Sequence, residues 1–165
     1  MDRTAIGSRR GMLFGISTLV IVLDRITKLA VERTLPVGDA HVVIPKVFRI
    51  THVVNAGAAF SLFGDSASPE RVRWMLVAFS WVAALVIIGA LARLGRSING
   101  TTLGLALILG GALSNAWDRI RHGVVTDFLE FHIVHYHWPD FNVADSCIVI
   151  GGILLVLHAL VARDE

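Results

Sequence analysis

The stretch WMLVAFSWVAALVIIGALA, residues 74–92, decides the fold class, because it is strongly apolar and contains no charged residue. A helix of about 20 such residues crosses the hydrocarbon core of a bilayer. Segments of similar character lie at about residues 11–31, 101–118 and 145–162. We therefore expect a single integral membrane domain over residues 1–165, with four transmembrane helices.

The composition of the whole chain agrees with a membrane protein. Hydrophobic residues occupy 55% of the 165 positions and charged residues 17%, and the mean hydropathy is +0.68. A soluble domain of this size would need more polar surface. The net charge of +2 is too small to indicate nucleic-acid binding. The single cysteine, Cys147, lies in an apolar run, which favours an inert packed thiol over a nucleophile.

Basic residues predict the orientation of the chain. Arg9 and Arg10 precede the first span, and Arg93 and Arg96 lie in the short connection between the second and third spans. The positive-inside rule places these segments in the cytoplasm, so both termini are expected there. The pair Arg9-Arg10 also resembles a twin-arginine export signal, but no convincing small-residue cleavage site follows it, which favours anchoring arginines.

Two connections on the other, periplasmic side contain β-branched residues. Segments 41–45 and 48–54 in the first connection, and 127–134 in the second, show the partial alternation that is typical of short strands. We expect these segments to form a small β-sheet at the membrane interface. The predicted fold class is an all-α membrane protein carrying this sheet, whose edge could pair with an extended peptide.

Polar side chains converge on that same side of the predicted topology. The end of the first span, the end of the third, the start of the fourth and the two longer connections all meet there. The polar residues that they bring are Asp24, Lys28, Asn55, Asn115, Asp118, Arg119, Asp127, Asn142 and Asp145. Such an asymmetry is expected of an active site. Ionisable groups at a membrane are costly, so several of them together indicate a function.

Asp127 and Asp145 are the candidate catalytic residues. They lie in the segments Val124–Phe128 and Phe141–Asp145, which flank the predicted sheet and the last span. Two carboxylates that face each other can share one proton and activate a water, which is the chemistry of an aspartic peptidase. This chemistry needs no metal, nucleotide or covalent intermediate. Asp24 and Lys28 are four residues apart on a helix, and we interpret them as a structural ion pair.

The polar residues near Arg119 and the histidines each allow two interpretations. Asp118 and Arg119 can be solvated at a helix end, or Arg119 can hold a substrate carbonyl while Asn115 and Asp118 order that corner. Three histidines crowd one segment, which allows a metal site or an aromatic belt at the lipid headgroups. The belt is favoured, and its members would be His132, His135, Tyr136, His137 and Trp138.

Two other classes of protein fit part of the pattern. A transporter would keep its acids at the membrane midplane along a pathway, whereas these acids cluster at one interface. An adaptor that binds other membrane helices would use small-residue stripes such as Gly110 and Ser114, and would need neither Asp127 nor Asp145. The clustering of acids favours the peptidase.

Five motifs occur together in a fixed order. They are Asp24-x-x-x-Lys28, Asn55-Ala56-Gly57-Ala58-Ala59-Phe60, Asn115-x-x-Asp118-Arg119, Val125-Thr126-Asp127-Phe128 and Phe141-Asn142-x-Ala144-Asp145. With these motifs, nearly the whole chain resembles lipoprotein signal peptidase (signal peptidase II) of bacterial inner membranes. Two positions depart from the family's pattern: Arg25 stands where Gln is frequent, and Ser114 where Gly is frequent.

The resemblance implies an aspartic endopeptidase that removes signal peptides from diacylglyceryl-modified prolipoproteins, cutting just before the lipidated cysteine. The implied catalytic residues are Asp127 and Asp145; the substrate-binding residues Asn55, Arg119 and Asn142; and the supporting residues Gly57, Asn115, Asp118, Asp24 and Lys28. The implied partners are prolipoproteins, membrane lipids and globomycin-type inhibitors, the last binding between the two aspartates. No metal or other cofactor is implied, and a monomer suffices for the chemistry.

Overall fold

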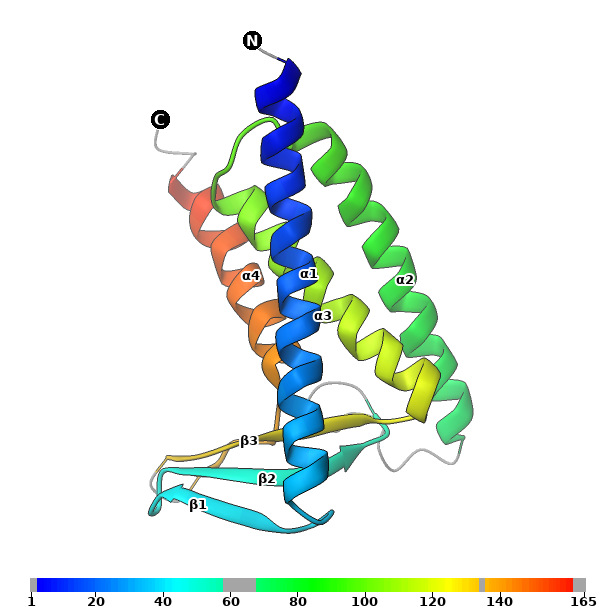
Figure 1. Ribbon diagram of the computed structural model, residues 1–165, viewed down its shortest axis with the longest axis vertical. Coiled ribbons are helices and arrows are strands. Elements are labelled where there is room, and N and C mark those ends of the chain that lie inside the picture. The colour runs from blue at the N-terminus through cyan, green and yellow to red at the C-terminus, as the bar shows by residue number, and fades with distance from the viewer. Residues whose placement is uncertain (1–2, 58–67, 134–135, 162–165) are drawn as a thin grey trace.

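Four helices and a small sheet make up the described part of the chain (Figure 1). The computed structural model describes residues 3–57, 68–133 and 136–161. The helices are α1 (Arg3–Thr34), α2 (Pro69–Leu94), α3 (Gly100–His122) and α4 (Val143–Val161). Each of the four expected spans overlaps one of these helices, and α2 begins at Pro69.

Two of the helices, α2 and α4, are long and apolar enough to cross a membrane, with mean hydropathies of 2.5 and 2.2 in their most apolar windows. Both helices expose large apolar side chains along their length. On α2, Phe79 is 73% exposed and Val86 67% exposed; on α4, Val156 is 60% exposed. Water would hydrate such a surface unfavourably, whereas lipid would cover it at no such cost.

Helix α3 is the centre of the bundle and contacts each of the other three helices. Its contact with α4 is close because two glycines face each other. A Cβ atom added to either Gly104 or Gly151 would lie 2.6 Å from the carbonyl oxygen of the other glycine. The absence of side chains therefore lets the two backbones touch.

The contact between α3 and α1 is close at the small-residue pair Gly110 and Ser114. A Cβ on Gly110 would lie 2.7 Å from the carbonyl oxygen of Ser17. One turn later, the Ser114 hydroxyl donates a hydrogen bond to Asp24 at 2.7 Å. The small-residue pair thus provides both room and a polar link between the helices.

Helix α3 is closed at both ends by its own sequence. Asn99 accepts a hydrogen bond from the Thr102 amide, and the Thr102 hydroxyl accepts one from the Asn99 amide, which forms a capping box. Gly123 ends the helix in the left-handed region, at φ 83°. The last turns of α3, which carry Asp118 and Arg119, are therefore held in a defined place beside the sheet.

The sheet is antiparallel and has the order β1-β2-β3-β4. Its strands are β1 (Ala40–Ile44), β2 (Phe48–Asn55), β3 (Val125–Ile133) and β4 (Tyr136–His137). The three strands expected from the sequence are confirmed. The two-residue strand β4 was not predicted.

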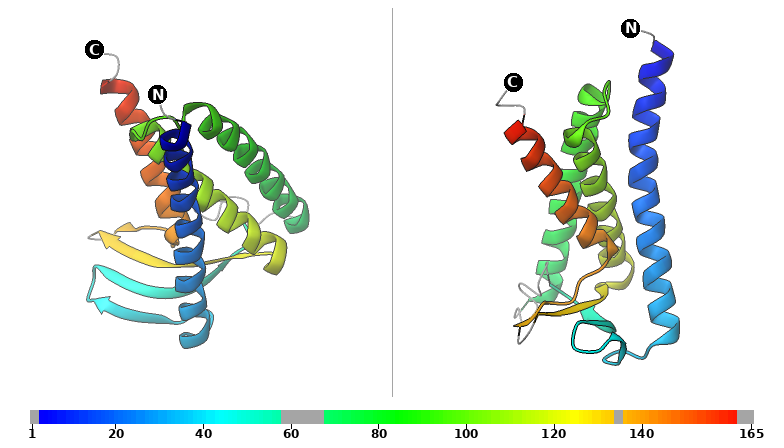
Figure 2. Two further views of the ribbon diagram at one scale, coloured as in Figure 1. Left: turned by 45° about the horizontal axis from the view of Figure 1, so that its top comes forward. Right: turned by 90° about the vertical axis from the view of Figure 1, so that its left-hand side faces the viewer.

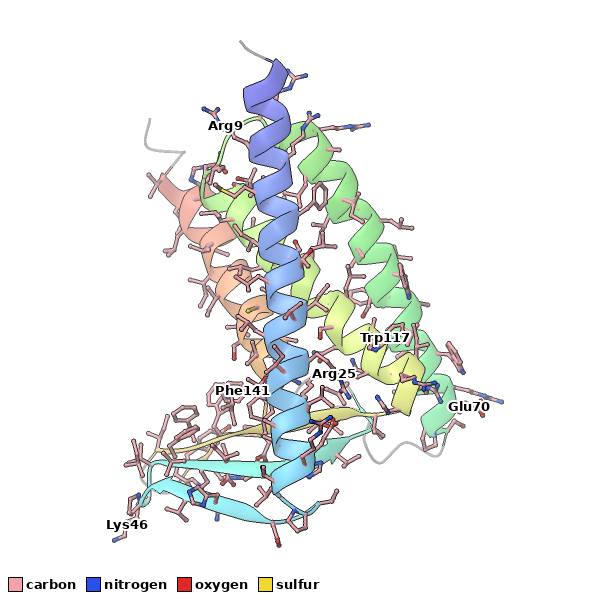
Figure 3. The ribbon with its side chains drawn as sticks, viewed as in Figure 1. Arg9, Arg25, Lys46, Glu70, Trp117 and Phe141 are labelled. Atoms are coloured by element: carbon pink, nitrogen blue, oxygen red, sulfur yellow. The ribbon has the colours of Figure 1, made fainter. Side chains whose placement is uncertain are left out.

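The sheet lies at one end of the bundle, and the two termini lie toward the other end (Figures 1 and 2). The side chains in Figure 3 mark the two ends: Lys46 lies at the outer rim of the sheet, and Arg9 lies beside the opposite end of α1. The end of α1, the end of α3 and the start of α4 all approach the sheet. Every element that carries a candidate site residue therefore reaches the same end of the molecule.

Candidate active site

Asp127 lies near the start of β3 and is 2% exposed. Each of its carboxylate oxygens accepts a hydrogen bond from an asparagine amide. Asn142 donates to Oδ1 at 2.7 Å, and Asn55 donates to Oδ2 at 2.8 Å. The carboxylate is therefore fixed in position by neutral donors from two other elements.

Asn142 connects Asp127 to Asp145. It is fully buried and immediately precedes α4. Its side-chain oxygen accepts a hydrogen bond from the backbone N–H of Asp145 at 2.9 Å. The backbone N–H of Asn142 in turn donates to Asp145 Oδ2 at 3.3 Å. These reciprocal bonds cap the first turn of α4. Asn142 therefore contacts both aspartates.

Asp145 also receives a hydrogen bond from Asn115 on α3, whose amide nitrogen lies 2.8 Å from Oδ1. The oxygen of the same Asn115 amide accepts from Lys28 at 2.9 Å. The orientation of Asn115 is fixed in this way, because Lys28 can only donate. The structure thus links the two aspartates through asparagines on α3 and at the start of α4.

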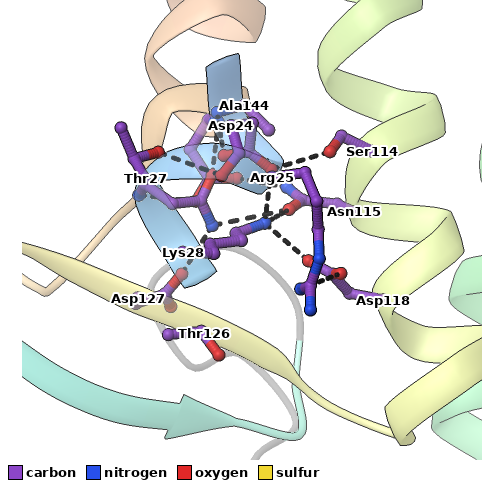
Figure 4. Close-up of polar contacts among 12 residues, drawn as sticks. Asp24, Arg25, Thr27, Lys28, Ser114, Asn115, Asp118, Thr126, Asp127 and Ala144 are labelled. Carbon is purple, nitrogen blue, oxygen red and sulfur yellow. Dashed lines mark hydrogen bonds and ion pairs between the residues drawn. The ribbon is translucent and has the colours of Figure 1, made fainter. Parts of the chain in front are cut away.

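Lys28 is fully buried and contacts acids on two helices (Figure 4). Its ammonium lies 2.6 Å from Asp24 Oδ2 on α1 and 2.7 Å from Asp118 Oδ2 on α3. The helical ion pair expected between Asp24 and Lys28 is confirmed. A buried ammonium of this kind is tolerated only because several oxygens surround it.

Asp24 joins three helices at one point. Besides Lys28, it accepts hydrogen bonds from the Ser114 hydroxyl on α3 and from the Ala144 amide on α4, the latter at 2.9 Å (Figure 4). The Ala144 amide is one of the N–H groups at the start of α4 that have no partner within the helix. Asp24 therefore sets the position of the turn that carries Asp145.

Arg119 is 8% exposed, so it is not simply solvated at the end of α3. Its guanidinium donates to the Gly57 carbonyl at 2.7 Å and to the Asn115 carbonyl at 3.3 Å. The Gly57 amide in turn donates to the Asn55 side-chain oxygen at 2.8 Å. Arg119 thereby holds the chain after β2 against α3. Within the described part of the chain, its Nε has no hydrogen-bond partner.

The asparagines expected to bind substrate are thus already engaged with Asp127 in this structure. The glycine of the second motif, Gly57, is described, whereas Ala58, Ala59 and Phe60 lie outside the described residues, as does His135. Sequence reasoning missed the links made by Ser114 and the Ala144 amide. It also missed Arg25, which bridges Asp118 and Glu32 at 3.4 Å each, and Thr126, which donates to Glu32 at 3.0 Å.

Burial dominates the electrostatics of Asp127. It raises the pKa of this carboxyl to about 7, and the nearby charge of Asp145 acts in the same direction. The amide donors Asn55 and Asn142, and the positive charge of Lys28, act in the opposite direction but do not cancel the effect of burial. Asp127 can therefore hold a proton near neutral pH.

A pocket of about 340 Å³ leads to Asp145 from the side of α4. Its walls are mostly apolar and come from the segment before α4 and from the outer face of that helix. The lining residues are Trp138, Asp140, Phe141, Asp145, Ser146, Ile148, Val149 and Ile150. Val149 and Ile150 are about half exposed, at 55% and 50%, so the pocket opens onto an apolar surface.

Solved structures with a similar fold define the class of protein. One is a bacterial membrane enzyme solved by the in meso method at 2.3 Å resolution, with a TM-score of 0.73 and 30% identity, covering 91% of this chain and 88% of that one. A second bacterial membrane enzyme, at 1.9 Å, has a TM-score of 0.69 and the same identity. This fold, with its apolar helices and buried polar site, is that of a membrane enzyme.

The sequence comparisons then give the family. The family model for signal peptidase (SPase) II matches residues 16–161. The lipoprotein signal peptidase of Paraburkholderia phytofirmans is 46% identical over 88% of this chain and 83% of that protein, and that of Burkholderia mallei is 42% identical over 97% and 96%. The chain belongs to the signal peptidase II family, which confirms the resemblance seen in the sequence. It is therefore a membrane protein and a protease that acts on lipoprotein signal peptides.

Proposed function

We propose that the chain is an aspartic endopeptidase that cuts diacylglyceryl prolipoproteins just before the lipidated cysteine, with Asp127 and Asp145 as its catalytic pair. The observation that carries this proposal is that Asn142 contacts both carboxylates, at 2.7 Å and 3.3 Å. The side-chain amide of Asn142 donates to Asp127 and its backbone N–H donates to Asp145, so one residue holds both carboxylates.

The proposed resting state has one proton on the pair. Asp127 carries it, because burial raises the pKa of this group to about 7. We assign the negative charge to Asp145, which lies in the first turn of α4, where the helix N–H groups stabilise an anion. The charge of Asp145 also raises the pKa of Asp127, which disfavours ionisation of both acids at once.

The proposed reaction uses the two carboxyls in different roles. Asp145 takes a proton from the water as the water oxygen attacks the scissile carbonyl carbon. At the same time Asp127 donates its proton to the carbonyl oxygen. The resulting tetrahedral intermediate collapses with cleavage of the C–N bond. As it collapses, a hydroxyl of the intermediate returns its proton to Asp127, and the leaving amine takes the proton that Asp145 gained from the water, so the original protonation state is restored.

The proposed substrate path follows α4. A lipidated peptide carries long apolar chains, and the apolar pocket opens beside Asp145 where Val149 and Ile150 are exposed. Asn55 donates to Asp127 and Arg119 donates to the Gly57 carbonyl, and backbone groups of the peptide could replace these internal hydrogen bonds. Globomycin-type inhibitors would occupy the same place between the two acids.

The proposed membrane disposition has four spanning helices in one domain and the sheet in the periplasm. Helix α1 supports this because its charged residues Asp24 and Lys28 are fully buried, whereas apolar residues such as Leu19 and Leu23 face outward at 55% and 46% exposure. The arginines at the end opposite the sheet favour cytoplasmic termini in a bacterial inner membrane. One protomer contains the complete catalytic pair.

The test is cleavage of a purified diacylglyceryl prolipoprotein by Asp127→Asn and Asp145→Asn variants. Each variant should lose at least about a hundredfold in turnover, because general acid–base catalysis supplies this much or more. Asp39→Asn, which alters an exposed aspartate in the same connection as Asn55, should retain full activity. Full activity in either test variant would reject the catalytic pair. Retained globomycin binding would show that the inactive variants are folded, and neither a transporter nor an adaptor would respond in this way.

A further inference from the structure

A second polar cluster lies on the sheet, at the end of β3 away from Asp127. Glu130 and His132 alternate along β3 and therefore project from the same face of the strand. His137 on β4 is the cross-strand partner of His132. The ligand atoms of these three side chains, one carboxylate oxygen and two imidazole nitrogens, all lie within 4.8 Å of one another.

The two imidazoles converge on the carboxylate and do not stack. Their ring centroids are 5.0 Å apart with an interplanar angle of 47°. The Nε2 atom of His137 contacts Glu130 Oε1 directly, and that of His132 lies 3.2 Å from Glu130 Oε2. This second contact is not a hydrogen bond: His132 Nε2 is buried and has no hydrogen-bond partner among the described residues.

We propose that Glu130, His132 and His137 form a binding site for a divalent transition-metal ion, of which Zn²⁺ fits the ligands best. Two imidazoles and one carboxylate are ligands that zinc accepts, whereas magnesium and calcium prefer oxygen alone. In a tetrahedral zinc site with bonds of about 2.0–2.1 Å, neighbouring ligand atoms lie about 3.3 Å apart. The separation between His132 and Glu130 already matches this value.

The surroundings of the cluster support a bound ion and leave it accessible. The Glu130 side chain is 4% exposed, which places the one anionic ligand in a fixed position, while the side chains of His132 and His137 are 28% and 50% exposed. Solvent can therefore reach the site and supply the fourth ligand. A metal ion would also give the buried His132 nitrogen the partner that it lacks.

Arg49 is the group that opposes metal binding. It lies opposite Glu130 on β2, and its guanidinium contacts both oxygens of that carboxylate. The Arg49 side chain is 37% exposed, so it can turn toward solvent when an ion takes its place. The positive charges of the Arg49 guanidinium and the metal ion repel each other beside Glu130. We therefore expect the Arg49→Gln variant to bind the ion more tightly than the unchanged protein.

The experiment is calorimetric titration of the full-length protein in detergent, without a histidine tag, with ZnCl₂, and in parallel optical titration with CoCl₂. We expect one ion per chain and the visible absorption of four-coordinate Co²⁺. Glu130→Gln, His132→Ala and His137→Ala should each weaken binding at least about tenfold. His41→Ala and His122→Ala, which remove exposed histidines elsewhere, are the matched controls and should bind as before.

Two results would overturn the proposal. The unchanged protein could show no saturable uptake of Zn²⁺, which would mean that Arg49 and the histidines only neutralise Glu130. Alternatively, the three ligand variants could bind as tightly as the controls, which would place any bound ion elsewhere on the chain. Neither result bears on the catalytic pair, because the readout is metal binding and not peptide cleavage.

Discussion

Two acids three residues apart on β3, Asp127 and Glu130, are both almost inaccessible to solvent but have different partners. Asp127 is 2% exposed and Glu130 is 3% exposed. Asp127 is surrounded mainly by neutral amides, from Asn55 and Asn142. Glu130 is surrounded by the Arg49 guanidinium and two imidazoles.

The pKa values of the two acids move in opposite directions. That of Asp127 rises to about 7, chiefly through burial. That of Glu130 falls to about 2, chiefly through its hydrogen bonds with Arg49. Burial alone therefore does not determine the proton affinity of a carboxyl; the charge of its partners decides whether burial is offset. Near neutral pH, β3 therefore has an acid that can hold a proton at one end and an ionised acid at the other.

The largest expected difference is in the free energy of unfolding, when the buried cation near Asp127 (Lys28) or the cation beside Glu130 (Arg49) is removed. Lys28→Met leaves Asp24 and Asp118 as buried charges without their cation, and should lower the free energy of unfolding by about 3–5 kcal/mol. Arg49→Met removes a cation that is 37% exposed and should lower it by only about 1 kcal/mol. Thermal unfolding in detergent measures both, and equal losses would contradict the distinction.

Asn142→Ala should have the next largest effect, on activity. It removes the amide that holds Asp127 and caps the turn of Asp145, and a misplaced catalytic group lowers the rate by about 10- to 100-fold. At the other end of the strand, His137→Ala should leave the cleavage rate within about threefold. If His137→Ala had the greater effect, the division of the strand into two functional ends would be wrong.

The pH dependence of cleavage tests the proton on Asp127. The proposed mechanism needs this group protonated, so the rate should fall as the pH rises through about 7. The Asn55 amide lowers the pKa of Asp127 by hydrogen bonding, and Asn55→Ala should therefore move this alkaline limb to higher pH. Val54→Ala, on the neighbouring exposed position of β2, should not move it. A shift to lower pH in Asn55→Ala would contradict the assignment.

Glu130→Gln should have the smallest effect on catalysis. The change keeps the shape of the side chain but removes its charge, and Glu130 has no part in the proposed proton transfer. The cleavage rate should stay within about threefold and the alkaline limb should not move. A displaced limb would mean that the two acids are coupled along the strand.

The sequence predicted the surroundings of Asp127, near the start of β3, better than those of Glu130, farther along the strand. Asp127, Asn142 and Asp145 lie in short motifs whose residue types already indicate the chemistry, and the helical spacing of Asp24 and Lys28 gave their ion pair directly. Three of the four strands followed from alternation and β-branched residues. Those features are local, so they can be read from the chain itself.

The features that were missed depend on packing between distant segments. Strand β4 is only two residues long, too short for alternation to be visible, and its pairing is what brings His137 to Glu130. The link from Asp24 to the Ala144 amide joins residues 120 positions apart and involves a backbone group that no motif marks. Ser114 was noted only as a small residue and as a departure from the family's pattern, and neither observation predicted the bond from its hydroxyl to Asp24.

The bond between Asp24 and the Ala144 amide has a consequence for biosynthesis. Asp24 lies on α1, but the backbone that it holds belongs to α4, which is synthesised after α1, α2 and α3. Asn142 and Asp145 are also synthesised after α3. A nascent chain that has inserted only α1, α2 and α3 therefore lacks one member of the proposed catalytic pair. The proposed hydrolytic activity therefore requires that α4 has entered the membrane.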